Sequence, residues 1–170
     1  SENYNFAHDL LLRFQTKNFR VEITQDIIGV ELGGAIKNIL AIAVGMTEGL
    51  GFGANAKAAV ITSGLSEMIE LGLTLGAKQE TFLGLSGLGD LVLTCTDNQS
   101  RNRRLGLALG QGLSLEETKK LIGTTEGYDT AKNIFFLIKK YGVKAPFCEG
   151  VYRILYEQKS PQTLFKDYFH

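Results

Sequence analysis

The feature that most constrains the fold is an apolar run over residues 27–46, which only a few polar residues interrupt. Its length approaches that of a membrane-spanning helix, but Glu31, Lys37 and Asn38 lie within it. A charge near the centre of a membrane helix costs about 3 kcal/mol on insertion scales. We therefore expect a helix buried in the core of a soluble protein, and the ammonium group of Lys37 within that helix requires an explanation.

Most of the remaining chain also has apolar residues at helical spacing, in segments that end at glycines such as Gly76. Only residues 19–24 alternate as a strand does, and one strand cannot form a sheet. This segment either pairs with something that the chain lacks or is an extended connector. We expect an all-α, multihelical domain over residues 25–170, preceded in residues 1–24 by a helix and a strand of another domain.

Composition excludes several classes of protein. Lys and Arg number 18, as do Asp and Glu, so the net charge is zero and gives no electrostatic case for binding nucleic acid or an anionic membrane. Cys95 and Cys148 form no CxxC pair and no secretory leader is evident, which indicates a reducing cytoplasm. The two histidines, His8 and His170, lie near the termini, so neither a Ser-His-Asp triad nor a histidine metal site is expected.

A glycine-rich stretch, Gly51-x-Gly53-x-x-Ala56, formally fits the dinucleotide-binding fingerprint. That fingerprint requires a preceding strand, so that the following helix directs its N-terminus at a pyrophosphate. Here a helix precedes the glycines. The stretch is better interpreted as a turn between two helices, with a glycine at positive φ.

Lys37 follows Gly33 and Gly34 by one helical turn. The missing side chains expose the helix backbone beside the lysine, so another chain segment or a small ligand can approach it. The alternative is that Lys37 lies at the edge of the helix and extends to solvent. Asp90, after a flexible turn at residues 87–89, is either an ordinary helix cap or a carboxylate that orients a nearby lysine.

A polar cluster, "SRNRR", stands at the start of an expected helix. A helix N-terminus offers free N–H groups and partial positive charge, and arginine adds a planar set of donors, so this combination suits a phosphate or a carboxylate. A solvated basic face and a nucleic-acid contact are the alternatives. The cluster comprises Ser100, Arg101, Asn102, Arg103 and Arg104.

Three segments together, residues 29–68, 84–96 and 100–106, closely resemble the C-terminal helical domain of bacterial NAD(P)-dependent glycerol-3-phosphate dehydrogenases. The resemblance extends over about residues 19–165. It implies a two-domain enzyme whose N-terminal Rossmann domain is absent from this chain. Residues 1–24 would then be a remnant of that nucleotide-binding domain, and residues 25–170 the substrate-binding domain.

The resemblance also implies roles in the substrate site. Lys37 matches the catalytic lysine that exchanges a proton with the C2 oxygen of the substrate, and Asn38 beside it is a candidate helper. Asp90 matches an acid that orients Lys37 and the substrate hydroxyl, and Thr94, one turn later, is a weaker candidate for the same network. The phosphate would be bound by the motif formed by Ser100, Arg101 and Asn102.

The cofactor implied is NAD(P)H, bound mainly by the absent domain. Arg101 matches a residue that also contacts the cofactor. Glu126 resembles the cofactor-contacting glutamate of a "VAEG" motif, although this chain has Thr124 and Thr125 in place of valine and alanine. The contact expected at Thr124 is therefore less secure than that at Glu126.

The activity implied is interconversion of dihydroxyacetone phosphate and sn-glycerol 3-phosphate for glycerophospholipid synthesis, in a cytoplasmic homodimer that binds neither nucleic acid nor membrane. Without the nucleotide-binding domain, these 170 residues should be inactive alone. Two alternatives stay open. One is the helical domain of another two-domain hydroxyacid or ketone reductase, and the other is a free-standing interaction or nucleic-acid-binding module that uses the "SRNRR" cluster.

Overall fold

The computed structural model describes residues 1–166, which contain helices and no strand. The all-α prediction is therefore confirmed. In order, the elements are α1 (Tyr4–Phe14), α2 (Ile27–Gly49), α3 (Ala54–Thr74), α4 (Gln79–Leu83), the π-helix η1 (Leu85–Gly89), α5 (Asp90–Thr96), α6 (Arg101–Gly110), α7 (Leu115–Ile122), α8 (Glu126–Tyr141), α9 (Pro146–Glu157) and α10 (Thr163–Lys166).

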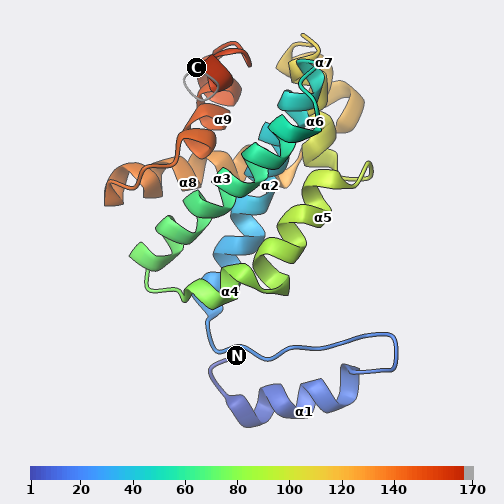
Figure 1. Ribbon diagram of the computed structural model, residues 1–170, viewed down its shortest axis with the longest axis vertical. Coiled ribbons are helices and arrows are strands. Elements are labelled where there is room, and N and C mark those ends of the chain that lie inside the picture. Colours follow the sequence, from blue (N-terminus) through green and yellow to red (C-terminus); the bar gives the residue numbers. More distant parts are fainter. Residues whose placement is uncertain (167–170) are drawn as a thin grey trace.

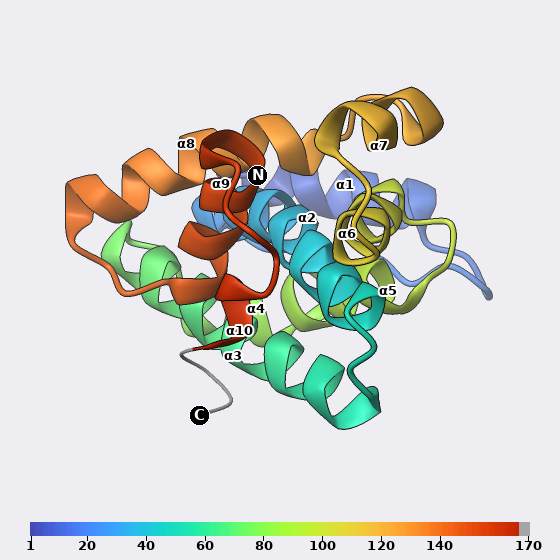
Figure 2. The same cartoon turned by 90° about the horizontal axis from the view of Figure 1, so that it is seen from above.

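Helix α2 is the centre of the bundle, and α3, α5, α6, α8 and α9 pack around it (Figures 1 and 2). Its middle is closed to solvent on all sides, with Ile39, Leu40 and Ile42 fully buried. Length and composition alone would allow α2 to cross a membrane, but 56% of its most apolar stretch is buried by other parts of the chain. A helix that is apolar all round is typically one enclosed by other helices, and α2 is enclosed in this way.

Glycines bring α6 into close contact with α2. A Cβ added at Gly45 of α2 would lie 2.0 Å from the carbonyl oxygen of Arg103, and one added at Gly106 of α6 would lie 1.9 Å from that of Ile42. Neither distance is possible for a real side chain, so the two backbones touch because both helices have glycine at the crossing. This crossing fixes the first turn of α6 beside the middle of α2.

The glycine-rich stretch after α2 is a helix-to-helix turn, as the sequence indicated. Gly51 has φ +83°, and Gly53 is the N-cap of α3. A helix, and not a strand, precedes this turn. The prediction that the formal dinucleotide fingerprint is only a turn is confirmed.

The segment before Asp90 differs from the prediction of a flexible turn. Residues Leu85–Gly89 form a π-helical turn that continues directly into α5. Gly87 permits this winding, because a Cβ there would lie 2.1 Å from the carbonyl oxygen of Phe82. The prediction of a loose loop is wrong because this close approach fixes the backbone. Single π-helical turns of this kind occur frequently at functional sites.

Helix α1 lies apart from the bundle and is joined to it by a long connector (Figure 1). None of its residues is buried. Residues 20–24 form no strand pairing, and an isolated bridge between Thr16 and Phe19 closes the preceding turn. Within residues 1–166 the segment has no strand partner, as both interpretations of it expected.

Candidate active site

Two glycines of α2 set the environment of Lys37 in different ways. A Cβ at Gly33 would lie 2.7 Å from the carbonyl oxygen of Ser86, so this glycine allows η1 to approach α2. Around Gly34, by contrast, a Cβ would meet no atom within 4 Å. The expected clearance beside Lys37 therefore exists. The π-helical turn η1 fills it at Gly33, and the space at Gly34 is open.

Lys37 and Asp90 meet as an ion pair. The Nζ of Lys37 donates to Oδ2 of Asp90, and the two side chains are 22% and 33% exposed. Asp90 is the first residue of α5, and the π-helical turn before it carries its backbone up to α2. Its carboxylate is not a helix cap. Of the two interpretations of Asp90, the structure favours the carboxylate that orients a lysine.

Thr94 lies one turn after Asp90 on the same face of α5. Its hydroxyl donates to the backbone carbonyl oxygen of Asp90 at 2.6 Å, and its distance to the carboxylate oxygen Oδ1 is 3.4 Å. Thr94 thus belongs to the same polar group as Lys37 and Asp90. Because its shorter contact is to the backbone, its influence on the carboxylate is the weaker one.

The first turn of α6 lies next to this ion pair. Ser100 is the N-cap, and its hydroxyl oxygen accepts from the N–H of Arg103 at 3.2 Å. Before it, Asp97 accepts from the N–H of Gln99 at 2.8 Å and forms the turn that leads into the helix. Arg101 stands at the exposed start of α6, where its guanidinium can meet an anion.

A cavity of about 300 Å³ joins these groups. The predicted residues that line it come from α2, α5, α6 and α8, which are far apart in sequence. The cavity is also lined by Leu93, Asp97 and Gln99, which sequence analysis did not identify. For Asp97 and Gln99, the polar run of residues 97–100 was a signal that could have identified them. The predicted lining residues are Lys37, Asn38, Thr94, Ser100, Arg101, Asn102 and Glu126.

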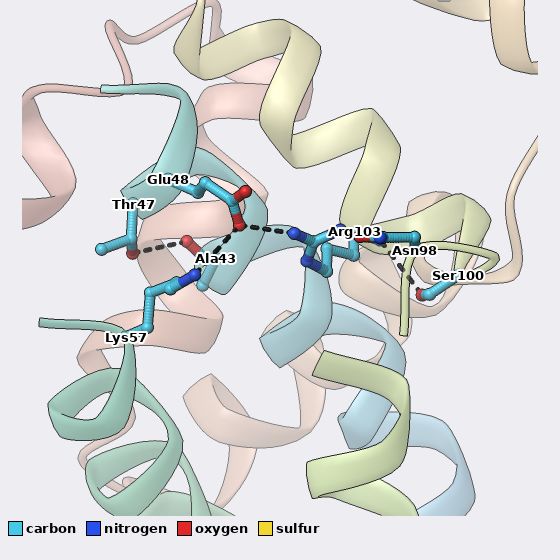
Figure 3. A network of polar contacts seen from close by, with 7 residues as sticks. All are labelled: Ala43, Thr47, Glu48, Lys57, Asn98, Ser100 and Arg103. Atoms are coloured by element: carbon cyan, nitrogen blue, oxygen red, sulfur yellow. Dashed lines mark hydrogen bonds and ion pairs between the residues drawn. The ribbon is translucent and has the colours of Figure 1, made fainter. Parts of the chain in front are cut away.

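Arg103 has a structural role, although it belongs to the predicted anion-binding cluster. Its side chain is 8% exposed and bonds to Glu48 at 2.5 Å and to Asn98 at 2.9 Å (Figure 3). Lys57 approaches the same carboxylate oxygen of Glu48 at 3.3 Å. Burial alone would raise the pKa of Glu48, but the hydrogen bonds and charges of Arg103 and Lys57 outweigh it and lower that pKa.

This network bears on the alternative of a nucleic-acid-binding module. Such a module would present the arginines of the "SRNRR" cluster to a phosphate backbone. Arg103 is turned inward and paired, which leaves Arg101 and Arg104 as the exposed arginines of the cluster. The network also ties α6 and the turn before it to the C-terminal part of α2, so it supports the shape of the cavity.

The two asparagines of the site are bonded to one another. The Nδ2 of Asn102 donates to Oδ1 of Asn38 at 2.9 Å, and Oδ1 of Asn102 accepts from the N–H of Gly127 at 3.0 Å. Both asparagines are more than nine-tenths buried. Both also line the cavity, and the substrate contact that the resemblance implies for them stays a prediction.

The start of α8 forms the far rim of the cavity. Glu126, its first residue, lies with an oxygen 3.7 Å from the guanidinium of Arg101, and the two side chains are 70% and 54% exposed. Thr124 is exposed, two residues earlier, and is not among the residues that line the cavity. Thr125, the N-cap, is buried, and its hydroxyl has no hydrogen-bond partner in the described part of the chain.

Two other features carry no chemistry of this kind. Within residues 1–166 no group of three or more His, Cys, Asp or Glu side chains could hold a metal ion. Cys95 and Cys148 are both buried, and burial raises the pKa of the Cys95 thiol to about 12, so it is not reactive at neutral pH.

A larger cleft of about 710 Å³ lies between α1, the connector and the start of α2, and its lining is mainly apolar.

The chain is similar to known proteins over nearly its whole length. Residues 26–166 match the sequence profile of a family described as the C-terminus of NAD-dependent glycerol-3-phosphate dehydrogenase. A glycerol-3-phosphate dehydrogenase [NAD(P)+] from Photobacterium profundum is 53% identical over 164 residues, which are 95% of this chain and 48% of that protein. The corresponding protein from Idiomarina loihiensis is 56% identical over 147 residues, or 86% of this chain and 44% of its own length.

Solved structures agree with the sequence comparisons. The crystal structure of glycerol-3-phosphate dehydrogenase from Coxiella burnetii superposes with a TM-score of 0.94 at 49% identity, and the match covers 99% of this chain and 52% of that one. The enzyme from Saccharomyces cerevisiae gives a TM-score of 0.82 at 31% identity, over 93% of this chain and 47% of that one. The chain thus spans about half the length of the relatives that it matches.

Proposed function

Because this chain belongs to the NAD-dependent glycerol-3-phosphate dehydrogenase family and matches the C-terminal part of its members, we propose that it supplies the substrate site of such an enzyme. The reaction would interconvert dihydroxyacetone phosphate and sn-glycerol 3-phosphate with NAD(P)H and provide glycerol phosphate for phospholipid synthesis. One observation carries this proposal: the Lys37–Asp90 ion pair stands beside a cavity that also contains Ser100, Arg101 and Asn102.

Lys37 is the proposed proton donor in reduction and the proton acceptor in oxidation. When bound, the nicotinamide cofactor supplies or receives the hydride at C2 of the substrate. Lys37 gives its proton to the C2 oxygen as negative charge develops there, and its ammonium also stabilises that charge. Asp90 holds the Nζ of Lys37 in place, and the partial exposure of both side chains lets the proton be replaced from water.

The phosphate of the substrate would be held at the first turn of α6. Arg101 offers a planar set of donors, and the helix N-terminus adds partial positive charge at the same place. Ser100 stands at the N-cap and lines the cavity. This arrangement favours a phosphorylated substrate over the hydroxyacid or ketone of the alternative reductase, because a cluster of donors suits the three oxygens of a phosphate better than a single carboxylate or an uncharged ketone.

The residues present fit the edge of a dinucleotide and not a complete site. Arg101 and Glu126 present charged, exposed groups at the rim of the cavity, and the unpaired hydroxyl of Thr125 lies in the same turn. Residues 1–166 contain no strand, so they hold no strand-loop-helix unit of the kind that binds a pyrophosphate. NAD(P)H would therefore be bound mainly by another domain, with Arg101, Glu126 and the neighbouring Thr124 at its edge.

The domain division is part of this proposal. Residues 1–24 would be the end of a nucleotide-binding domain, and residues 25–170 the substrate-binding domain. Helix α1 supports this division, because within residues 1–166 none of its residues is buried and apolar side chains such as Leu12 and Phe14 stay exposed. A cytoplasmic homodimer acting on a small phosphorylated substrate, without nucleic acid or membrane, is the setting we propose; light scattering of the complete protein would test the dimer.

Replacement of Lys37 tests the central assignment. In a complete enzyme that includes the nucleotide-binding half, Lys37→Met should lower kcat at least about 10²-fold, the usual contribution of a general acid, while nucleotide affinity stays close to that of wild type. The exposed Lys132 of α8 provides a matched control, and Lys132→Met should retain full turnover. The isolated 170-residue chain should be inactive. Substantial turnover by the Lys37→Met enzyme would rule out Lys37 as the proton donor.

A further inference from the structure

A four-residue loop, residues 97–100, joins α5 to α6 and carries part of the candidate active site. Three of its residues line the cavity, namely Asp97, Gln99 and Ser100, and Asn98 is the exception. Ser100 is also the N-cap of α6, so its place decides where the first turn of that helix presents its free N–H groups. The position of this loop therefore matters for an anion bound at the cavity.

Asn98 is tied to a buried arginine of α6. Its Oδ1 accepts a hydrogen bond from Nη1 of Arg103 at 2.9 Å (Figure 3). The other terminal nitrogen of the same guanidinium, Nη2, pairs with Glu48 near the end of α2 at 2.5 Å. Because the guanidinium is planar and its donors have fixed directions, one rigid group sets the loop against the central helix.

Arg103 is itself held firmly in place. Its side chain is 8% exposed, and its backbone lies at the crossing of α2 and α6, where a Cβ at Gly45 would lie 2.0 Å from its carbonyl oxygen. Glu48, its partner, is also bonded to Lys57 of α3 at 3.3 Å. Arg103 is therefore an anchor whose backbone and side chain are both fixed, and Asn98 is the side chain by which the loop reaches it.

The remaining bonds of the loop are local. Asp97 accepts from the N–H of Gln99 at 2.8 Å through its carboxylate and from the N–H of Ser100 at 3.2 Å through its carbonyl oxygen. The hydroxyl of Ser100 caps α6. These bonds give the turn its shape and join it to its own helix. The bond of Asn98 differs from them, because it continues through Arg103 to α2.

Resting on the proposed function, we propose that Asn98 is a positioning residue for the phosphate of the substrate. Through Arg103 it holds the loop against the end of α2, and it thereby sets the place of Ser100 and of the Arg101 that follows. It acts through these two neighbours. Loss of the Asn98 side chain would leave Arg103 paired with Glu48, so the anchor would remain while the loop moves more freely.

Two substrates of the complete enzyme separate this role from support of the fold. Dihydroxyacetone has the reacting carbonyl group of dihydroxyacetone phosphate but no phosphate. Asn98→Ala should lower kcat/KM for the phosphorylated substrate about three- to tenfold, mainly through KM, which is the range of one net hydrogen bond. It should leave kcat/KM for dihydroxyacetone unchanged. A purely structural role would lower the amount of active enzyme, and hence both values by the same factor.

Two further variants sharpen this test. Lys57→Met removes a cation from Glu48 but keeps both bonds of Arg103, so it should leave both substrates at the wild-type level. A loss equal to that of Asn98→Ala would indicate general electrostatic attraction and would overturn the role of Asn98. Arg103→Lys keeps the charge but loses the planar pair of donors, so it should reproduce the effect of Asn98→Ala on the phosphorylated substrate.

Binding measurements give a readout that does not depend on turnover. By calorimetry, the dissociation constant of sn-glycerol 3-phosphate should rise about three- to tenfold in Asn98→Ala, while that of NADH or NADPH stays unchanged. Asn98 is exposed, so its truncation leaves no cavity in the core, and circular dichroism establishes that the variant is folded.

The outcomes for Asn98 and for the proposed function can be told apart. An active wild-type enzyme whose Asn98→Ala variant has unchanged constants for both phosphorylated ligands would overturn the role of Asn98 alone. A complete wild-type enzyme that does not reduce dihydroxyacetone phosphate would overturn the proposed function and this inference with it.

Discussion

Lys37 and Asp90 form an ion pair although 53 positions separate them in the sequence. Lys37 is held on the central helix, and Asp90 is brought to it by a π-helical turn that fits against the glycine notch of that helix. An acid that holds a lysine without removing its access to water is suited to repeated proton transfer.

Asp90→Asn should lower kcat of the complete enzyme by about 10²-fold or more, because the neutral amide has the same shape but no longer stabilises or orients the ammonium of Lys37. The measurement is steady-state kinetics, with circular dichroism to establish that the fold is kept. A kcat within a factor of about three of wild type would show that the ion pair has no part in catalysis.

Arg101→Ala should raise the KM for dihydroxyacetone phosphate by about 10- to 100-fold, the range expected for loss of a hydrogen bond between charged groups. Arg104 provides the control, since it lies on the same helix and is also exposed. Arg104→Ala should leave this KM nearly unchanged. Equal effects of both substitutions would indicate general electrostatic attraction in place of a phosphate site at Arg101.

From the buried carboxyl group of Glu67 we expect the free energy of unfolding to fall as the pH rises toward neutrality. It accepts from the N–H groups of Phe147 at 2.8 Å and Cys148 at 3.0 Å, but burial outweighs these bonds and raises its pKa to about 7. Since the folded pKa lies above the ordinary value of 4.5, the folded state binds the proton more tightly, and stability falls as pH rises from 4.5 to 7. The shift of about 2.5 pKa units corresponds to about 3–4 kcal/mol at most, at roughly 1.4 kcal/mol per unit.

Urea unfolding at pH 5, 6 and 7 measures this effect. Wild type should lose more free energy of unfolding over this interval than Glu67→Gln, which cannot ionise. Because Gln offers one oxygen to two N–H groups, it should be less stable overall, and the comparison concerns the change with pH and not the absolute value. Parallel curves for the two proteins would contradict a raised pKa at Glu67.

The crossing of α2 and α6 predicts opposite effects of the same substitution within one helix. Gly45→Ala should lower the free energy of unfolding by about 1–3 kcal/mol or more, because its Cβ would meet the carbonyl of Arg103. Gly34→Ala should be neutral or stabilising by up to about 1 kcal/mol, because its Cβ would enter open space and alanine favours a helix. Chemical unfolding of both variants measures the difference, and equal losses would contradict the tight crossing.

Sequence patterns were informative wherever the cause of a structure is local. The apolar run of residues 27–46 predicted a buried central helix, and the glycines after it predicted a turn with positive φ. Asp26 and Ser100 act as N-caps at the starts of α2 and α6, as polar residues before apolar or helical segments do. The spaced motifs also identified the family, and the comparisons confirm it.

Contacts between distant segments were beyond these patterns. Residue patterns alone offered Asp90 as a cap or as a partner of lysine, and the family resemblance implied the partner. The approach of η1 to Gly33 is what brings the two side chains together. It grouped Arg103 with Arg101, but the fold turned one inward to Glu48 and left the other at the cavity. Residues that are adjacent on a helix point in different directions, so their roles depend on what lies across from each.

By itself, then, the sequence determined the helices, the position of the lysine within the core helix, and the family. Tertiary structure showed how Lys37 meets Asp90, a pair that the resemblance implied, and it alone decided that Asn102 bonds to both Asn38 and Gly127. The physical reason is that helix formation depends on neighbours within a few residues, whereas these partners meet only because backbones cross closely at glycines. Whether a glycine is needed at such a crossing depends on the atoms opposite it, and those atoms belong to a distant part of the chain.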